Sequence, residues 1–176
     1  MPEKVSDESV HTGRAPGVER LWAGWRSAYL DGPKPEGCVL CGLLDTTNDK
    51  DAFVVWRGRL AAVVLNAYPY SSGHLMVLPT RHVGEIEGLA SEESAELWQA
   101  LGRAVRALKA AYSPDGLNVG ANLGEAAGAG VPGHLHLHVV PRWNADTNFM
   151  TTVAEARVLP EALDATYDRV KDSWPS

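Results

Sequence analysis

The feature of this chain with the most chemical content is a row of three histidines at alternate positions, His134, His136 and His138, separated by single leucines. In a β-strand, residues i, i+2 and i+4 share one face. The spacing therefore predicts that the three imidazoles point the same way, while the apolar residues between them enter a core. Imidazole can attack an electrophile, shuttle a proton or bind a metal ion near neutral pH. We interpret the row as a chemical site.

A segment rich in glycine and alanine, 124–133, leads directly into these histidines. Glycine lets the backbone approach a ligand closely, and the N–H groups of such a loop, around Gly130, can cradle a phosphate. Arg142 follows the histidines and can sit near an anionic group. Each signal alone has an ordinary alternative, a flexible turn for the loop and a solvated charge for the arginine. Their place beside the histidines favours a site for a small phosphorylated ligand.

The two cysteines of the chain, Cys38 and Cys41, are spaced as Cys-x-x-Cys. In a chain of the cytoplasm this spacing indicates metal or redox chemistry rather than a structural disulfide. Zinc needs about four ligands, and His82 with one of the three alternating histidines are the economical choices for the other two. A thioredoxin-like redox pair is the alternative, but that motif normally opens a helix after a strand. Here the pair follows a Pro/Gly-rich loop, which favours zinc.

The bulk composition limits the other classes of function. The chain has 176 residues and a net charge of −6, which is the size of one domain with tails and disfavours extended nucleic-acid binding. No apolar run approaches the roughly 20 residues of a membrane helix, and residues 1–17 contain no apolar signal core. We therefore expect a cytoplasmic protein without a membrane partner, with a disordered tail over 1–17 and one domain over 18–176.

The pattern of apolar residues predicts an α+β fold with a mostly antiparallel five-stranded sheet. We expect a long helix from Ser91, as its N-cap, to Tyr112, because leucines and Val105 recur there at helical spacing. Pro160 and Glu161 are expected to open a C-terminal helix, and residues 18–30 are expected to be ordered, with a short helix as one option. The expected strands cover 52–57, 60–66, 74–79, 117–122 and 134–140.

Several of these segments together resemble the histidine-triad (HIT) proteins. The histidine row ends in Val139 and Val140, residues 66–79 resemble the nucleotide-binding hairpin of the family, and 118–122 with the glycine-rich loop resembles its second ligand-binding segment. The resemblance covers residues 18–176. Within the family, the motifs at 21–29, 139–143, 148–150 and 158–161 are most similar to the actinobacterial branch of diadenosine tetraphosphate phosphorylases and ATP adenylyltransferases.

This resemblance implies a HIT-like fold and a nucleotidyl-transfer reaction. His136 is implied as the nucleophile, which attacks the α-phosphorus of a dinucleoside polyphosphate and forms a nucleotidyl-histidine. His138 is implied to contact the phosphate and assist the leaving group, and His74 to orient the histidines. Water or inorganic phosphate then releases the product, and the sequence does not distinguish hydrolysis from phosphorolysis. Two alternatives remain, hydrolysis of a nucleoside phosphoramidate and a nucleotide-binding module without turnover; the intact His136 favours an enzyme.

The resemblance also implies binding roles. Asn66 is expected to bond the ribose, Asn122 and the backbone near Gly130 to hold phosphates, and hydrophobic residues near Leu65 and Leu75 to pack on the base. Most triad hydrolases have Gln, Ser or Thr a few residues before the first histidine, where this chain has 130–133 as Gly-Val-Pro-Gly.

The same resemblance extends to the metal and to assembly. His134 is implied as a ligand of a structural zinc ion, together with Cys38, Cys41 and His82. Proteins of the family are commonly homodimers, and Trp98 on the long helix is a candidate contact.

Overall fold

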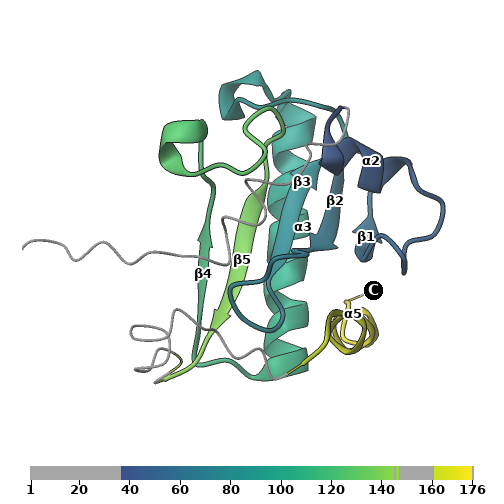
Figure 1. Cartoon of the computed structure of the whole chain (residues 1–176), viewed down its shortest axis with the longest axis vertical. Coiled ribbons are helices and arrows are strands. Elements are labelled where there is room, and N and C mark those ends of the chain that lie inside the picture. The colour runs from purple at the N-terminus through teal and green to yellow at the C-terminus, as the bar shows by residue number, and fades with distance from the viewer. Residues whose placement is uncertain (1–36, 145, 147–160, 176) are drawn as a thin grey trace, which may run out of the picture.

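The computed structural model describes residues 37–144, 146 and 161–175, and its centre is a five-stranded antiparallel sheet. The strands are ordered β1-β2-β3-β5-β4, so β4 and β1 form the edges (Figure 1). The predicted α+β class with five antiparallel strands is confirmed. The elements are β1 (Val54–Arg57), β2 (Ala61–Leu65), β3 (Leu75–Pro79), β4 (Gly116–Gly120), β5 (Leu137–Arg142), α2 (Val39–Asp45), α3 (Ser91–Tyr112) and α5 (Leu163–Asp172).

The two faces of the sheet bury different residues. Odd-numbered side chains of the central strands, such as Val63, Val77 and Val139, pack with α3 in the main core. Even-numbered side chains, such as Val64 and Met76, form a second cluster on the opposite face. This separation follows from the period of two along a strand, and every residue of β2 and β3 is buried because both faces are covered. One face of the sheet therefore carries the main core, and the other carries the smaller second cluster, in which Met76 also lines a pocket.

Helix α3 spans the back of the sheet (Figure 1). The predicted long helix is confirmed, but its N-cap is Ala90 rather than Ser91. The side chain of Glu93 supplies the cap, because its Oε2 atom accepts the backbone N–H of Ala90 at 2.8 Å. Helix α5 confirms the predicted C-terminal helix, but it begins at Leu163 after the N-cap Ala162, so Glu161 does not open it. The helix packs against β1, and Trp174, just after its end, stacks on Trp56 with ring centroids 6.1 Å apart. Neither of these helices, nor any other within the described part of the chain, is long and apolar enough to span a bilayer.

Strand β5 is shorter at its start than predicted. It begins at Leu137, so His134 and His136 precede the strand. The reason lies in the partner strand, because β3 ends at Pro79, which has no N–H to continue the ladder. The backbone N–H of Leu135 bonds instead to the carbonyl of Val83 at 2.7 Å. The apolar residues between the histidines still enter the main core, as predicted.

The N-terminal segment and several motifs cannot be compared with the structure. The expected tail 1–17, the ordered segment 18–30 and the motifs at 148–150 and 158–160 lie outside the described residues. Helix α2, which begins immediately after Cys38, was not expected from the sequence.

Candidate functional site

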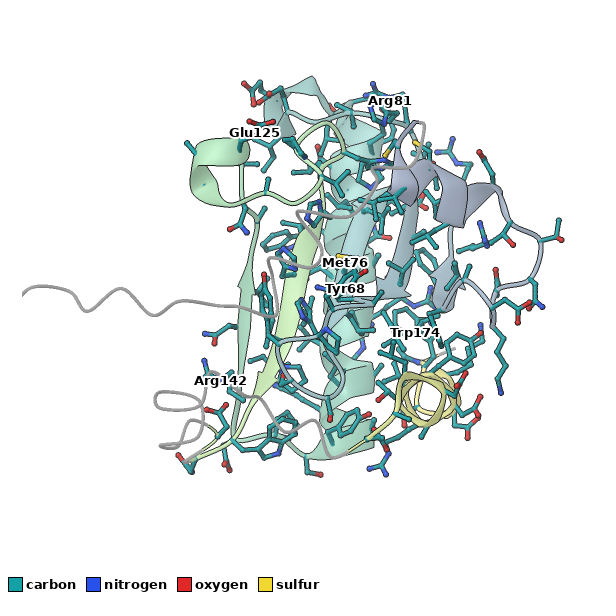
Figure 2. All side chains as sticks on the ribbon, in the orientation of Figure 1. Tyr68, Met76, Arg81, Glu125, Arg142 and Trp174 are labelled. Atoms are coloured by element: carbon teal, nitrogen blue, oxygen red, sulfur yellow. The ribbon has the colours of Figure 1, made fainter. Side chains whose placement is uncertain are left out.

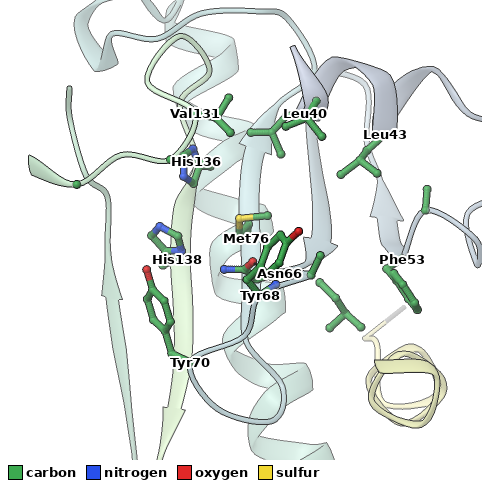
Figure 3. A pocket seen from close by; sticks show the side chains of 16 residues that line it. Leu40, Leu43, Phe53, Asn66, Tyr68, Tyr70, Met76, Val131, His136 and His138 are labelled. Atoms are coloured by element: carbon green, nitrogen blue, oxygen red, sulfur yellow. Dashed lines mark hydrogen bonds between the residues drawn. The ribbon is translucent and has the colours of Figure 1, made fainter. Parts of the chain in front are cut away.

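A pocket of about 150 Å³ lies on the face of the sheet opposite α3. His136 and His138 form one side of it, and Leu40 and Leu43 of α2 face them across Met76 (Figure 3). Its walls are mostly apolar, with few polar groups, which is typical of a site for a small organic ligand. The lining residues are Val39, Leu40, Leu43, Ala52, Phe53, Leu65, Asn66, Ala67, Tyr68, Tyr70, Met76, Gly128, Gly130, Val131, His136 and His138.

The protonation of His136 is determined by a backbone carbonyl. Its Nδ1 atom lies 2.8 Å from the carbonyl oxygen of His134. A carbonyl oxygen only accepts, so Nδ1 of the neutral ring carries the hydrogen and Nε2 keeps its lone pair. His136 is 7% exposed and lines the pocket. The carbonyl, a group that does not titrate, therefore leaves the Nε2 lone pair of the neutral ring available to a ligand.

A chain of two hydrogen bonds determines which ring nitrogen of His138 carries the hydrogen. The backbone N–H of Tyr70 donates to Nδ1 of His74 at 3.0 Å. The neutral His74 ring must then carry its hydrogen on Nε2, which lies 2.9 Å from Nδ1 of His138. His138 accepts that hydrogen bond and carries its own hydrogen on Nε2. The pocket thus presents a lone pair on His136 and an N–H donor on His138, with ring centroids 5.0 Å apart.

The predicted binding residues do not all reach the pocket. Asn66 lines it and lies against His74, with Nδ2 3.3 Å from the His74 Nδ1 atom and Oδ1 accepting the Tyr68 N–H at 2.9 Å. Gly130 also lines the pocket. Asn122 is not a lining residue, and its Nδ2 donates to the carbonyl of Gly128 at 3.5 Å. The pocket is therefore lined by the backbone of the loop and not by the side chain of Asn122.

Arg142 lies at the far end of β5 from the pocket. Figure 2 shows it well away from Tyr68 and Met76, which mark the pocket. Its guanidinium forms an ion pair with Asp146 at 2.5 Å and donates to Oδ1 of Asn118 at 2.8 Å. In this arrangement the side chain is used to join β5 to its neighbours, and it does not line the pocket.

The sequence did not predict all of the residues that build this site. Leu75 was expected near the base, but it is fully buried in the main core, and its neighbour Met76 lines the pocket instead. The alternation of side chains along β3 could have identified Met76, because it pairs with His138 of β5 and lies on the same face of the sheet. Tyr70 was missed as well, and its ring lies 4.6 Å from that of His74.

The four residues predicted to bind metal come together at one end of the sheet. The donor atoms of Cys38, Cys41, His82 and His134 all lie within 4.8 Å of one another. The Sγ atoms lie 3.4 Å (Cys38) and 3.5 Å (Cys41) from Nδ1 of His134, and Cys41 Sγ lies 3.3 Å from Nδ1 of His82. Tetrahedral zinc with ordinary Zn–S and Zn–N bonds separates such atoms by about 3.5 Å. The donor set and its spacing therefore fit a closed four-ligand zinc ion.

His134 is prepared for this role by its surroundings. Its Nε2–H donates to the carbonyl of Pro79 at 2.9 Å, which leaves the Nδ1 lone pair directed at the cysteines. Burial lowers the pKa of His134, aided by the nearby His82 and His136 and opposed by the Pro79 carbonyl, so the ring is neutral as a metal ligand must be.

The redox alternative for the cysteines is partly supported by the fold. The pair does lie at the start of a helix, because α2 begins just after Cys38; the expected Pro/Gly-rich loop before it lies outside the described residues except for Gly37. However, burial, with further contributions from Cys38, raises the pKa of the Cys41 thiol, whereas a redox-active thiol in such a motif has a lowered pKa. Two imidazoles also face the pair, as metal ligands would.

The comparisons with known proteins agree with this geometry. The model of the HIT domain matches residues 47–145. The chain belongs to the HIT family. This HIT protein is 40% identical to an AP-4-A phosphorylase of Mycobacterium tuberculosis over 170 residues. The match covers 92% of this chain and 87% of the M. tuberculosis protein. The HIT-like fold predicted from the sequence is thereby confirmed.

Solved structures of HIT proteins share the architecture. A Zn-bound histidine triad family protein from Mycobacterium smegmatis is 26% identical, with a TM-score of 0.63 over 78% of this chain and 92% of that chain. A hypothetical histidine triad nucleotide-binding protein from Sulfolobus tokodaii is 28% identical, with a TM-score of 0.58 over 69% of this chain and 82% of that chain. The five-stranded sheet of this HIT protein is therefore that of its family.

Proposed function

We propose that this protein is a nucleotidyl transferase or hydrolase that cleaves a dinucleoside polyphosphate, such as diadenosine tetraphosphate, at the α-phosphorus. The observation that carries the proposal is the opposite polarity of two adjacent imidazoles, a lone pair on His136 and an N–H on His138, each set by a backbone group. The name of the M. tuberculosis relative, AP-4-A phosphorylase, supports the substrate class.

The first half-reaction forms a nucleotidyl-histidine. Nε2 of His136 attacks the α-phosphorus, and the bond from phosphorus to the bridging oxygen breaks. The remaining polyphosphate leaves with that oxygen, and the Nε2–H of His138 stabilises the negative charge by donating a hydrogen bond to it. The Nδ1–H of His136 stays on the carbonyl of His134, which stabilises the positive charge that develops on the ring.

The second half-reaction transfers the nucleotidyl group to an acceptor. Water or inorganic phosphate attacks the phosphorus, and the bond to His136 breaks with its electron pair returning to Nε2. The proton lost by an attacking water molecule goes to solvent. Water gives a nucleoside monophosphate and phosphate gives a nucleoside diphosphate. The apolar walls accept the base, with Asn66 at the ribose and the backbone near Gly130 at the phosphates. Asn122 holds the loop through the carbonyl of Gly128, and Arg142, bound to Asp146 and Asn118 at the far end of β5, has no direct part in the reaction.

The metal of the four-residue cluster is zinc in this proposal. Cysteine and histidine are ligands that zinc prefers, and the Zn-bound M. smegmatis protein supports the choice. With four protein ligands the ion has no open position for substrate, so its chemistry is structural.

The protein is also proposed to be a homodimer. The support is Trp98 on α3, whose side chain is 71% exposed although tryptophan is largely buried in most proteins. A second copy of the chain that covers this face would bury it.

The deciding experiment incubates the purified protein with diadenosine tetraphosphate, with and without inorganic phosphate, and identifies the nucleotides formed. ADP that appears only with phosphate identifies a phosphorylase, and AMP without phosphate identifies a hydrolase. Mixtures with radiolabelled substrate are then denatured at alkaline pH, where the phosphorus–nitrogen bond survives, and digested, and the label is expected on His136. Label on another side chain, or no turnover of a dinucleoside polyphosphate, would refute the proposal. Turnover restricted to adenosine 5′-phosphoramidate would favour the alternative reaction, and binding without turnover a nucleotide-binding module.

A further inference from the structure

Helix α2 belongs to two sites at once. Cys38, immediately before the helix, and Cys41 within it supply two of the four metal ligands. Leu40 and Leu43 of the same helix line the nucleotide pocket. Figure 3 shows both leucines on the side of the pocket opposite the histidines. A displacement of α2 would therefore change the pocket and the metal centre together.

The helix has little stability of its own. It contains seven residues and has no side-chain cap at its N-terminus, whereas isolated helices shorter than about 12–15 residues are marginal in water. Leu40 is its only residue classed as buried. Helix α2 also takes no part in the main core between the sheet and α3. Its position is therefore set by the packing of Leu40 in the second cluster, with Leu43 and Leu44 against it, together with contacts at its two ends.

The C-terminal end of α2 is held by Arg57 of β1. The guanidinium donates to the carbonyls of Leu44 at 2.5 Å and Thr46 at 3.0 Å, and its Nε atom pairs with Asp49 at 2.6 Å. Among the described residues, no charged side chain holds the N-terminal end in the same way. There, the thiols of Cys38 and Cys41 contact His82, His134 and one another, and a thiol is a weak hydrogen-bonding group.

We propose that the metal bound by Cys38, Cys41, His82 and His134 is the N-terminal anchor of α2, and that it thereby holds Leu40 and Leu43 as a wall of the nucleotide pocket. This inference rests on the proposed function. It predicts that nucleotide affinity depends on metal occupancy although no ligand of the metal touches the nucleotide. Residues 39–45 thus become determinants of substrate affinity.

The effect of metal loss should be confined to the wall. His134 keeps its hydrogen bond to Pro79 without the ion, and its carbonyl continues to hold His136. The main core contains no residue of α2. The metal-depleted protein is therefore expected to stay folded with its nucleophile in place, while the base loses the leucines that contact it.

The test measures AMP binding by isothermal titration calorimetry to the full chain, zinc-loaded and depleted with a chelator. We expect the dissociation constant to rise about tenfold or more on depletion, the scale for losing a small apolar contact with a ligand, and to recover when zinc is returned. Amide hydrogen exchange over residues 39–45 should accelerate in the depleted protein, with the circular dichroism spectrum unchanged. Equal AMP affinity and equal exchange in the two forms would overturn the proposal.

A pair of variants tests the wall with the metal in place. Leu43→Ala shortens a lining residue, and Leu44→Ala makes the same change on a neighbouring residue of the helix that does not line the pocket. Leu43→Ala should weaken AMP binding more than Leu44→Ala, with one zinc ion per chain in both. Equal affinities would refute the role of α2 even if depletion unfolds the protein. If zinc-loaded wild-type protein binds no AMP, the proposed function itself fails, and exchange over 39–45 still decides whether the metal holds α2.

Discussion

Replacement of His74 by phenylalanine tests the hydrogen-bond chain that sets the polarity of the site. His74 is 1% exposed and joins the Tyr70 N–H to Nδ1 of His138. Phenylalanine keeps a ring of similar size but neither accepts the first hydrogen bond nor donates the second. His138 is then free to place its hydrogen on Nδ1, which removes the donor that faces the substrate.

The expected loss follows from the single hydrogen bond that is removed. A hydrogen bond between neutral groups contributes about 1–1.5 kcal/mol, and about 1.4 kcal/mol corresponds to a tenfold change in rate. The rate of diadenosine tetraphosphate cleavage should therefore fall about tenfold. The orphaned Tyr70 N–H should also lower the free energy of unfolding by about 1–3 kcal/mol, so the variant is first checked by thermal unfolding and assayed well below its midpoint.

The assay distinguishes a lost donor from a general disturbance of the pocket. The phenyl and p-nitrophenyl esters of AMP present the same nucleotide, but phenolate is the more basic leaving group and needs a donor more. His74→Phe should slow the phenyl ester more than the p-nitrophenyl ester, whereas His136→Asn should abolish both reactions. Equal slowing of the two esters by His74→Phe would refute the assignment of His138 as the donor and leave His74 as a packing residue.

Three further predictions concern stability, metal and assembly. The pKa of Glu93 is lowered from its usual 4.5 to about 2, mainly by the hydrogen bond from Arg81 and then by the backbone N–H of Ala90. The carboxylate therefore stabilises the folded state above pH 4.5, and this stabilisation is lost as the pH falls toward 2. In urea titrations, the advantage of wild type over Glu93→Gln should shrink between pH 5 and pH 2, and a constant difference would contradict it. Elemental analysis should find one zinc ion per chain, lost in Cys38→Ser; native protein without metal would refute the zinc assignment. Trp98→Asp should halve the mass measured by sedimentation equilibrium, and an unchanged dimer would exclude this face.

The sequence was most informative where a local pattern determines a local structure. Alternation of histidine and leucine correctly predicted a core on one side, although Pro79 makes the strand itself begin at Leu137. On the other side His136 and His138 line the pocket, and the chemistry expected of them stays a prediction. The periodicity of α3 predicted its length for the same reason. These features depend on neighbours in the chain, which a single sequence contains.

The features that the sequence did not predict depend on distant partners. Helix α2 is too short to be recognised by periodicity, and its order depends on Arg57 and on the metal ligands. The role of Tyr70 depends on its backbone N–H, which every residue except proline has. Arg142 looked available for phosphate, but Asp146 and Asn118 already bind its guanidinium.

The division of the sheet into odd-numbered and even-numbered residues has a consequence for altering this protein. Side chains such as Met76 can be exchanged to reshape the pocket, while Val77 and the other odd-numbered residues of the central strands still pack against α3. A deletion of one residue within β3 would have the opposite outcome, because every side chain after the deletion would change faces. Core residues would then point toward the pocket, and pocket residues toward α3. Libraries of substitutions at even positions should thus contain many folded members with new selectivity, and single-residue indels almost none.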